Sequence, residues 1–300
     1  TRDAKYAQLI MKLSDWIARS RDDRQGLRDK VRGHVVTAWG STNYSKGIRY
    51  AWAVHTGMIV APMARFAAVV RSDKTLKARW EADADRLLKI AEEAVSVHDD
   101  EFREGPGADE GYVYCPYLKK HLPLNMQNAL ARAWLAIDDA TKTPKHRERV
   151  MRLARFLKNR LRPMADGSYV WAYWPPLEGA AESFEDISHA SINVDFLVLC
   201  SEHGIVFTRE DLARLEKTLL KRVLLADDRI SDSVGGGGSF KKHLPAVLLW
   251  GRLGRHFPAV RDRLIQFSRL PGLDRESTAL PLGIAYLSLP STSPGEPGRN

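Results

Sequence analysis

Apolar residues recur three and four positions apart along almost the whole chain. In the first segment of this kind, residues 4–19, Leu9, Leu13 and Trp16 follow that spacing. Residues three and four apart share one face of a helix, so the segment reads as an amphipathic helix. Strict alternation of apolar and polar residues, the sign of a half-buried strand, is nearly absent. The pattern therefore predicts an all-α protein.

The predicted helices are separated by turns with recognisable stop and start signals. Gly204 stops one helix, and Thr208 with Asp211 has the spacing of a capping box that starts the next. Pro62 predicts a kink or a break within its helix. In chain order, the predicted helices are residues 4–19, 46–71, 75–101, 124–141, 144–161, 183–203, 208–224, 241–251, 256–270 and 277–287.

These helices follow one another as antiparallel pairs, and the chain has no fixed repeat period. The missing period argues against repeat solenoids, and helical hairpins in series can instead close into a ring. We therefore expect an α/α toroid, either a closed or an incomplete barrel. No shift in composition marks a boundary, so residues 1–290 are expected to form a single domain. Residues 291–300 are expected to be a disordered tail.

Four loops are long and rich in aromatic residues, glycine or proline: residues 33–46, 105–123, 163–183 and 231–239. Long structured loops in a compact helical fold usually carry function, and a toroid would gather them at one end of its cavity. The last loop contains four consecutive glycines, Gly235–Gly238, which suggest a flexible lid or a close backbone approach to a ligand.

The net charge of +9 and the pI near 9.5 favour an anionic partner. Basic residues stand beside acidic ones throughout, and no long block of one sign appears, so a nucleic-acid partner is not expected. No apolar run approaches the eighteen or so residues that cross a bilayer, so membrane insertion is not expected either; the best candidate, residues 187–200, reads as a core helix. Cys115 and Cys200 are expected to be buried thiols.

The densest group of chemically capable residues lies in residues 169–193. Four aromatic residues come first, and Ser183 with Asp186 then has capping-box spacing, which predicts a helix start at Ser183. On that helix, Glu185 or Asp186 can share a face with His189. A histidine held by a carboxylate near a helix start suits acid–base chemistry. The alternative is a capping network with a buried structural histidine.

Aromatic rings beside carboxylates, histidine and asparagine are typical of carbohydrate sites, because sugar rings stack on them while polar groups bind the hydroxyls. A core aromatic cluster is the alternative. Two other segments share this character: residues 39–58, and residues 112–128, where Asn125, Gln127 and Asn128 open a helix. Arg49 and Trp52, with His55, are expected to form one helical stripe, and arginine suits a uronate carboxylate. The predicted substrate-binding residues are Trp39, Tyr44, Arg49, Tyr114, Trp171, Tyr173, Trp174 and Asn193.

Several chemistries lack their motifs. The chain has no G-x-S-x-G, P-loop, H-E-x-x-H or C-x-x-C segment. Asp186 and His189 have the spacing of a carboxylate-bridged metal motif, but that site needs a second copy on facing helices. Neither a metal nor another cofactor is therefore expected.

Together, the segments YAWAVHTGM, LPLNMQNALARAWLAI, YVWAYW and EDISHASINVDF resemble bacterial α/α-barrel polysaccharide lyases of the glucuronan and alginate lyase kind. The resemblance covers roughly residues 35–220 and concerns how these segments are arranged along the chain. It implies metal-independent β-elimination on an acidic polysaccharide, and a secreted or periplasmic location. Candidates for binding the uronate carboxylate are then Asn125, Arg49 and Glu185. The base would be His189 or a tyrosine such as Tyr50, with His55 a further catalytic candidate.

Two other functions stay open at this stage. A glycoside hydrolase on the same toroid would use paired carboxylates. Enough acids are available for it: Asp109, Glu110, Glu178, Glu182 and Asp186. A helical scaffold that binds glycans or proteins without catalysis is the other.

Overall fold

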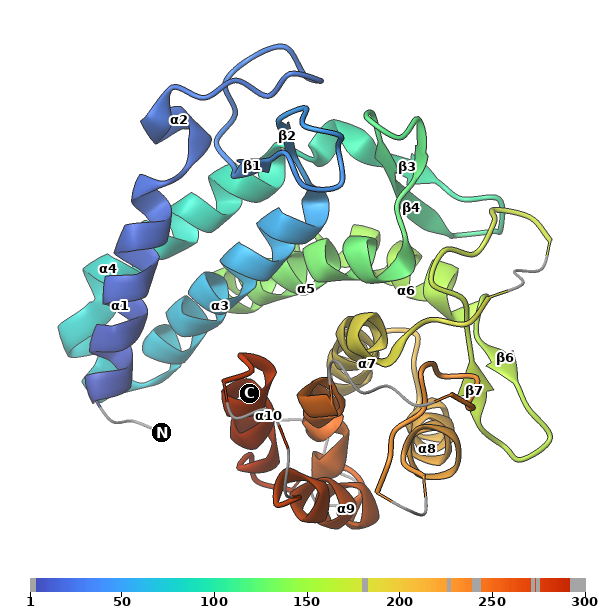
Figure 1. Cartoon of the computed structure of the whole chain (residues 1–300). Helices are drawn as coiled ribbons and strands as arrows, with labels where there is room; N and C mark the ends of the chain where they lie inside the picture. The colour runs from blue at the N-terminus through green and yellow to red at the C-terminus, as the bar shows by residue number, and fades with distance from the viewer. Residues whose placement is uncertain are drawn as a thin grey trace. The chain divides into compact units, whose positions relative to one another are not determined.

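The computed structural model describes residues 4–179, 183–225, 228–238, 244–270, 273 and 276–291. The chain is mostly helical, with 58% helix and 9% strand (Figure 1). The expectation of an all-α protein is therefore confirmed at this level. Residues 292–300, most of the expected tail, lie outside the described residues.

Contacts divide the chain into two compact units. Unit 1 comprises residues 1–105, 111–122 and 126–153, and unit 2 comprises residues 106–110, 123–125 and 154–300. Each unit is described by itself below. The single domain over residues 1–290 stays a prediction.

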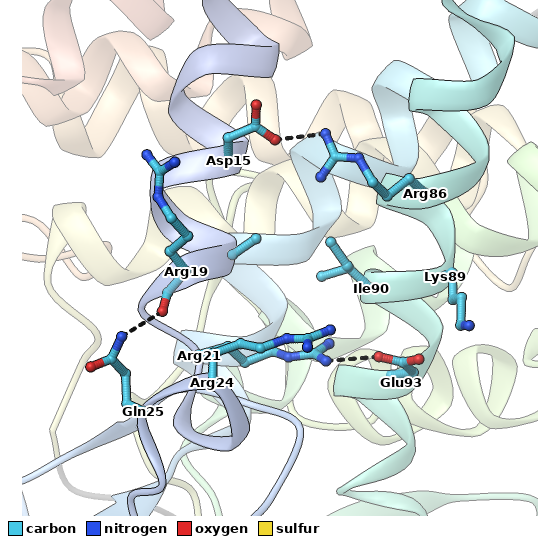
Figure 2. Close-up of a pocket in the computed structure, with 10 residues that line it drawn as sticks. Asp15, Arg19, Arg21, Arg24, Gln25, Arg86, Lys89, Ile90 and Glu93 are labelled. Atoms are coloured by element: carbon cyan, nitrogen blue, oxygen red, sulfur yellow. Dashed lines mark hydrogen bonds and ion pairs between the residues drawn. The ribbon is translucent and has the colours of Figure 1, made fainter.

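Unit 1 is built around helices, with short strands in its loops. Its elements are α1 (Ala4–Arg19), α2 (Asp22–Gln25), β1 (Gly40–Ser41), β2 (Tyr50–Ala51), α3 (Ala53–Ser72), α4 (Lys74–Ser96), η1 (Asp99–Glu101), β3 (Phe102–Glu104), β4 (Gly111–Cys115), β5 (Lys120–His121), nearly all of α5 (Leu124–Thr141) and the start of α6 (Arg147–Lys158). A recess of about 620 Å³ opens between α1, α2 and α4 (Figure 2).

Helices α3 and α4 form a tight hairpin, and Asp73 between them caps α4 by accepting hydrogen bonds from the backbone N–H groups of Thr75 and Leu76. Helix α3 begins at Ala53, so the predicted start at residue 46 is wrong. The cause is a strand pair, because Tyr50–Ala51 bonds to Gly40–Ser41. The helix runs on through Pro62, so there is no break there, and the alternative of a kink at Pro62 stays a prediction.

The expectation that no apolar run approaches the length of a membrane span is wrong for helix α3. Its 20 residues have a mean hydropathy of 1.5, which is long and apolar enough to cross a membrane, whereas residues 187–200 do not meet that test. Inside the structure, 61% of the apolar window is buried, which is the pattern of a core helix. The apolar composition of α3 is thus accounted for by packing within unit 1.

Strands β3, β4 and β5 form a small antiparallel sheet. Strands β4 and β5 lie inside the predicted loop at residues 105–123, and β3 lies directly before it. Burial alternates along β4, where Gly111, Val113 and Cys115 are buried. The sequence GYVYC carries this alternation, so the strand is a feature that the sequence analysis missed. Gln127 on α5 fixes the sheet, because its side-chain oxygen accepts a hydrogen bond from the Val113 N–H at 2.8 Å.

Unit 2 contains the remaining helices. Its elements are the end of α6, β6 (Arg162–Pro163), β7 (Tyr169–Val170), α7 (Ile187–Glu202), α8 (Arg209–Thr218), the π-helical turn η2 (Leu219–Val223), the 3₁₀ segment η3 (Leu244–Arg255), α9 (Pro258–Ser268) and α10 (Ala279–Leu287). The capping box of Thr208 and Asp211 is confirmed. Gly204 has a φ of 64°, as its role as a helix stop requires.

Helix α7 begins at Ile187 rather than at Ser183, so the predicted capping box there is wrong. Asp186 is the N-cap residue, and Glu185 precedes the helix. Buried ion pairs hold the far part of the helix, because Arg252 on η3 binds Asp195 at 2.7 Å and Glu202 at 3.2 Å. The α7–η3 contact is therefore both apolar and charged.

Gly57 allows the backbones of α3 and α5 to approach each other. A Cβ at this position would overlap the backbone of Ala129, which cannot move aside as a side chain could. We expect Gly57→Ala to destabilise the protein by about 1–3 kcal/mol, because overpacking outweighs the gain in helix propensity. Urea unfolding measures this.

The control for Gly57→Ala is Val69→Ala on the exposed face of the same helix. It should change the free energy of unfolding by less than about 0.5 kcal/mol. A Gly57→Ala protein that is as stable as the wild type would contradict the close contact.

Candidate functional site

The start of α7 is organised by the carboxylate of Asp186. This carboxylate accepts hydrogen bonds from the backbone N–H groups of Ser188 at 2.9 Å and His189 at 3.1 Å, which caps the helix. It also accepts from the Ser188 hydroxyl at 2.5 Å and contacts Nδ1 of His189. Partial burial acts to raise the pKa of Asp186, but hydrogen bonds from His189 and Ser188 outweigh it and hold the pKa well below its usual range. Asp186 is therefore charged at neutral pH.

His189 is held at one nitrogen and open at the other. Its Nδ1 bonds to Asp186, while Nε2 has no partner among the described residues. The side chain is 44% exposed, and the Tyr173 ring lies beside it with a centroid separation of 5.0 Å. With Nδ1–H donating to the carboxylate, Nε2 carries the lone pair, and no described residue binds it. This arrangement is suited to general-base chemistry.

Glu185 does not orient His189, contrary to one of the two expectations for the helix start. It is fully buried, and one of its carboxyl oxygens accepts from the Trp171 indole N–H and, at 2.6 Å, from the Asn193 amide. The other oxygen, Oε1, is buried without a partner among the described residues. Burial raises the pKa of Glu185 well above its usual value. Burial thus favours the neutral form of Glu185, which lies in the core of unit 2 directly before the Asp186 cap.

The aromatic loop splits between core and surface. Trp171 is buried against Trp250 and bonded to Glu185, whereas the sequence analysis expected an open ring. Tyr173 and Trp174 are half-buried. Asn193 is buried on the Glu185 side of α7. Of the predicted sugar-stacking rings in this loop, only Tyr173 and Trp174 are thus partly open.

Asn125 lies beside this loop, because a backbone hydrogen bond joins the two segments. The N–H of its neighbour Leu124 donates to the Tyr173 carbonyl at 3.2 Å. The Asn125 side chain is buried, and its amide oxygen has no partner among the described residues. A buried polar group without a partner needs a specific explanation, such as a bound molecule.

The glycine-rich loop serves as packing rather than as a free lid. The Val234 N–H donates to the Glu185 carbonyl at 2.9 Å, and Ser233 forms a bridge with Asp186. A Cβ on Gly235 would overlap the ring of Phe184. Residues 231–238 therefore support the segment that carries Glu185 and Asp186.

Arg49 and Trp39, two of the site residues predicted in unit 1, bind partners within the protein. Arg49 forms a double ion pair with buried Asp22, with N–O distances of 2.6 and 3.1 Å, and does not share a helix stripe with Trp52. Trp39 is buried and its indole N–H donates to the Ile17 carbonyl at 2.9 Å. The structure thus gives Arg49 and Trp39 partners within the protein, against the expectation that they face a ligand.

Tyr50 is also buried. Its hydroxyl donates to Glu101 at 2.9 Å, and burial raises its pKa far above the usual value. A tyrosine that stays protonated and faces a carboxylate is not a base in this state. The expectation that Tyr50 removes a proton therefore has no support from its surroundings.

The remaining predicted residues of unit 1 are Tyr44, His55 and Tyr114. Tyr44 is 69% exposed, and its ring lies 6.2 Å from Trp52 and 6.1 Å from half-buried His55. Burial lowers the pKa of His55, so its neutral form is favoured. Tyr114 is half-buried below Arg103, at 5.5 Å. The residues predicted from the sequence therefore form separate groups within each unit.

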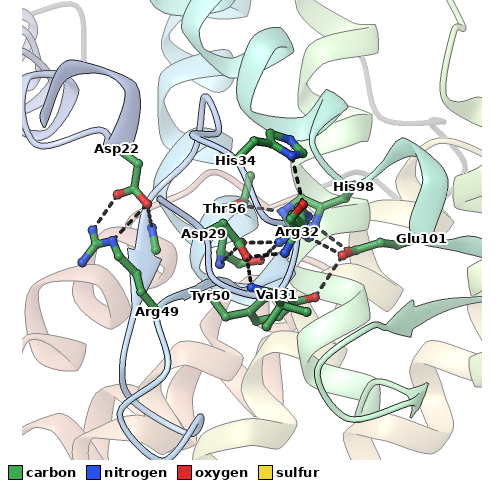
Figure 3. Close-up of polar contacts among 12 residues, drawn as sticks. Asp22, Asp29, Val31, Arg32, His34, Arg49, Tyr50, Thr56, His98 and Glu101 are labelled. Atoms are coloured by element: carbon green, nitrogen blue, oxygen red, sulfur yellow. Dashed lines mark hydrogen bonds and ion pairs between the residues drawn. The ribbon is translucent and has the colours of Figure 1, made fainter. Parts of the chain in front are cut away.

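Sequence reasoning missed a buried charge network in unit 1 (Figure 3). Arg32 pairs with Asp29 at 2.6 Å and with Glu101. His98 Nδ1 lies 2.6 Å from Glu101, and His98 Nε2 lies 2.9 Å from the Thr56 hydroxyl. The charged residues in the segments RDKVRGH and HDDE were the only sequence signal for this network. Nothing in the sequence indicates that these two segments, about 70 positions apart, contact each other. Among the described residues, no group of three His, Cys, Asp or Glu side chains could hold a metal ion.

The buried acid Glu185 should make the stability of the protein depend on pH. The unfolded chain releases this proton above about pH 4.5, whereas the folded protein retains it, so stability falls as pH rises above that value. Glu185→Gln keeps an oxygen that can accept both hydrogen bonds and cannot ionise. We expect its melting temperature to exceed that of the wild type at about pH 8, and the difference to shrink at about pH 5. An equal loss of stability at both pH values would show that Glu185 is ionised when folded.

Comparisons of this chain with protein-family models, with curated proteins and with solved structures give no match.

Proposed function

We propose that the protein is a polysaccharide lyase that cleaves a uronate-containing chain by β-elimination without a metal ion. The observation that carries the proposal is the Asp186–His189 pair, in which Nδ1 contacts Asp186, Nε2 has no partner among the described residues, and the side chain is 44% exposed. The net charge of +9 further favours an anionic polymer. The resemblance of the four sequence segments to α/α-barrel lyases supports the same reaction.

In the proposed reaction, Nε2 of His189 removes the proton from C5 of a uronate residue. The electron pair left by this proton forms the C4–C5 double bond, and the C4–O4 bond breaks. The departing O4 takes a proton from solvent and the His189 imidazolium returns its proton to solvent, so one chain becomes two without the addition of water. Asp186 stabilises the imidazolium that forms, as the carboxylate partner of a catalytic histidine does.

The proposal assigns the uronate carboxylate to the side-chain NH₂ group of Asn125, because an amide nitrogen donates to a carboxylate and the unpaired amide oxygen does not. Negative charge builds up on this carboxylate as C5 loses its proton, so a donor there stabilises the transition state. Half-buried Tyr173 and Trp174 are the proposed stacking surfaces for the sugar rings. The α/α toroid belongs to the proposal as well, and the high helix content supports it.

A glycoside hydrolase is the second candidate, because the pKa of Glu185 is raised and that of its neighbour Asp186 is lowered. Two carboxyl groups with opposite shifts are the mark of an acid and a base or nucleophile. The other acids are less suited to it: Asp109 pairs with Arg155, Glu110 pairs with Arg160, and Glu182 lies outside the described residues. Full burial of Glu185 favours the lyase.

Replacing His189 should abolish most of the activity without unfolding the protein. With glucuronan or alginate as substrate, the absorbance of the C4–C5 double bond reports turnover. His189→Ala should lower turnover by about 10²–10⁴-fold, the usual contribution of a general acid–base group. Asp186→Asn should also lower turnover while preserving the helix cap, because asparagine caps as well as aspartate does.

The matched control is His34→Ala, which changes an exposed histidine of unit 1 and should leave turnover unchanged. Unchanged turnover in His189→Ala would remove His189 from the mechanism. New reducing ends without an unsaturated product would replace the lyase with the hydrolase.

A further inference from the structure

The recess of unit 1 is a separate feature from the groups described above. It opens between α1, α2 and α4 and has a volume of about 620 Å³. Cavities of about 300–1,000 Å³ are the usual size for small-ligand sites. Its lining residues are Asp15, Ala18, Arg19, Arg21, Arg24, Gln25, Arg86, Lys89, Ile90 and Glu93.

The lining carries an excess of positive charge. Five of its side chains are cationic and two are anionic. Each anionic side chain is already paired, since Asp15 binds Arg86 at 2.6 Å and Glu93 binds Arg21 at 2.9 Å (Figure 2). Three cations remain beyond these pairs.

The remaining cations are Arg19, Arg24 and Lys89. The structure gives the Arg19 and Lys89 side chains no partner among the described residues. Arg24 is 67% exposed, and its Nε lies 3.6 Å from Asp23, which is beyond hydrogen-bond range. Two of these cations, Arg19 and Lys89, thus have no partner among the described residues, and Arg24 has only a long ion pair with Asp23.

At the base of the recess, Arg21 has an unused donor. Its side chain is only 3% exposed, and two of its nitrogens are bonded to Asp23. Its Nη1 is buried without an acceptor among the described residues. The Arg21 and Arg24 guanidinium groups approach the same oxygen of Asp23, at 2.9 and 3.6 Å. One carboxylate therefore lies between two guanidinium groups.

The excess of cations in the recess and the unused Nη1 donor of Arg21 both favour a bound group of high negative charge. A buried N–H donor without an acceptor is costly, and arginine pairs favour planar or tetrahedral oxyanions because several N–H groups can donate at once. The neighbouring apolar atoms of Ala18 and Ile90 lower the local dielectric and strengthen such contacts. The charge is concentrated in a recess rather than along a stripe, which fits a compact group.

We propose that this recess binds ligands through an oxyanion group, either a free anion such as phosphate or a carboxylate carried by a uronate oligomer. Arg24 and Lys89 provide the exposed contacts, and Arg21 provides the buried charge behind them. The site does not depend on the proposed lyase activity, since none of its residues belongs to the group around His189.

Calorimetric titration of the full chain with inorganic phosphate and, separately, with a glucuronate oligomer tests the proposal. At least one probe should bind saturably, and its binding should weaken at high salt. The double variant Arg24→Gln, Lys89→Gln should weaken that binding by about tenfold or more, because two charge-assisted contacts are lost. Both replaced side chains are exposed, so the melting temperature should stay near that of the wild type.

The matched control is Lys30→Gln, Lys74→Gln, which removes the same charge from exposed positions of unit 1 outside the recess. The control should bind as the wild type does. Binding of phosphate alone would identify a free anion as the ligand, and binding of the oligomer alone a chain-borne carboxylate. The proposal is overturned if neither probe binds saturably, or if the control loses as much affinity as the recess variant.

Discussion

The arrangement around His189 depends on the carboxylate of Asp186. The same group caps α7 through two backbone N–H groups and holds Nδ1 of the histidine. Because the cap fixes where the helix begins, it also fixes the direction in which the imidazole leaves the first turn. Ser233 and Val234 then hold the residues just before the helix from the other side. A single ionised side chain thus connects helix initiation, the tautomer of the histidine and the outward orientation of Nε2.

Adjacent positions in this segment have opposite electrostatic environments. Glu185 is fully buried and neutral, while Asp186 is half-exposed and charged. The two carboxyl groups differ in charge because they have different numbers of hydrogen-bond donors. Asp186 receives hydrogen bonds from the helix start and from two side chains, whereas one oxygen of Glu185 receives none. Burying a charge costs several kcal/mol unless it is well paired, so Glu185 retains its proton. In unit 1, by contrast, Glu101 is buried but is contacted by Arg32, Tyr50 and His98.

The sequence predicted the helices well and the segments between them less well. Residues 4–19 and 124–141 were predicted with the observed ends, because their apolar periodicity is uninterrupted. The start of α3 was misplaced because the apolar run from Tyr50 is continuous, although Tyr50–Ala51 forms a strand. In the site, the three-residue spacing correctly brought Asp186 to His189, but the four-residue spacing equally suggested Glu185. Local spacing cannot reveal that Arg49 meets Asp22, or that Trp171 meets Glu185, since such partners are set by packing of distant segments.

The most direct test of this account is the tautomer of His189 in the wild-type protein. Nitrogen NMR of the labelled protein distinguishes the two ring nitrogens of the neutral imidazole. The account predicts a proton on Nδ1, shared with Asp186, and an unprotonated Nε2 that can accept a proton from a substrate. A proton on Nε2 with a bare Nδ1 would contradict it, because the nitrogen that faces outwards would then have no free lone pair.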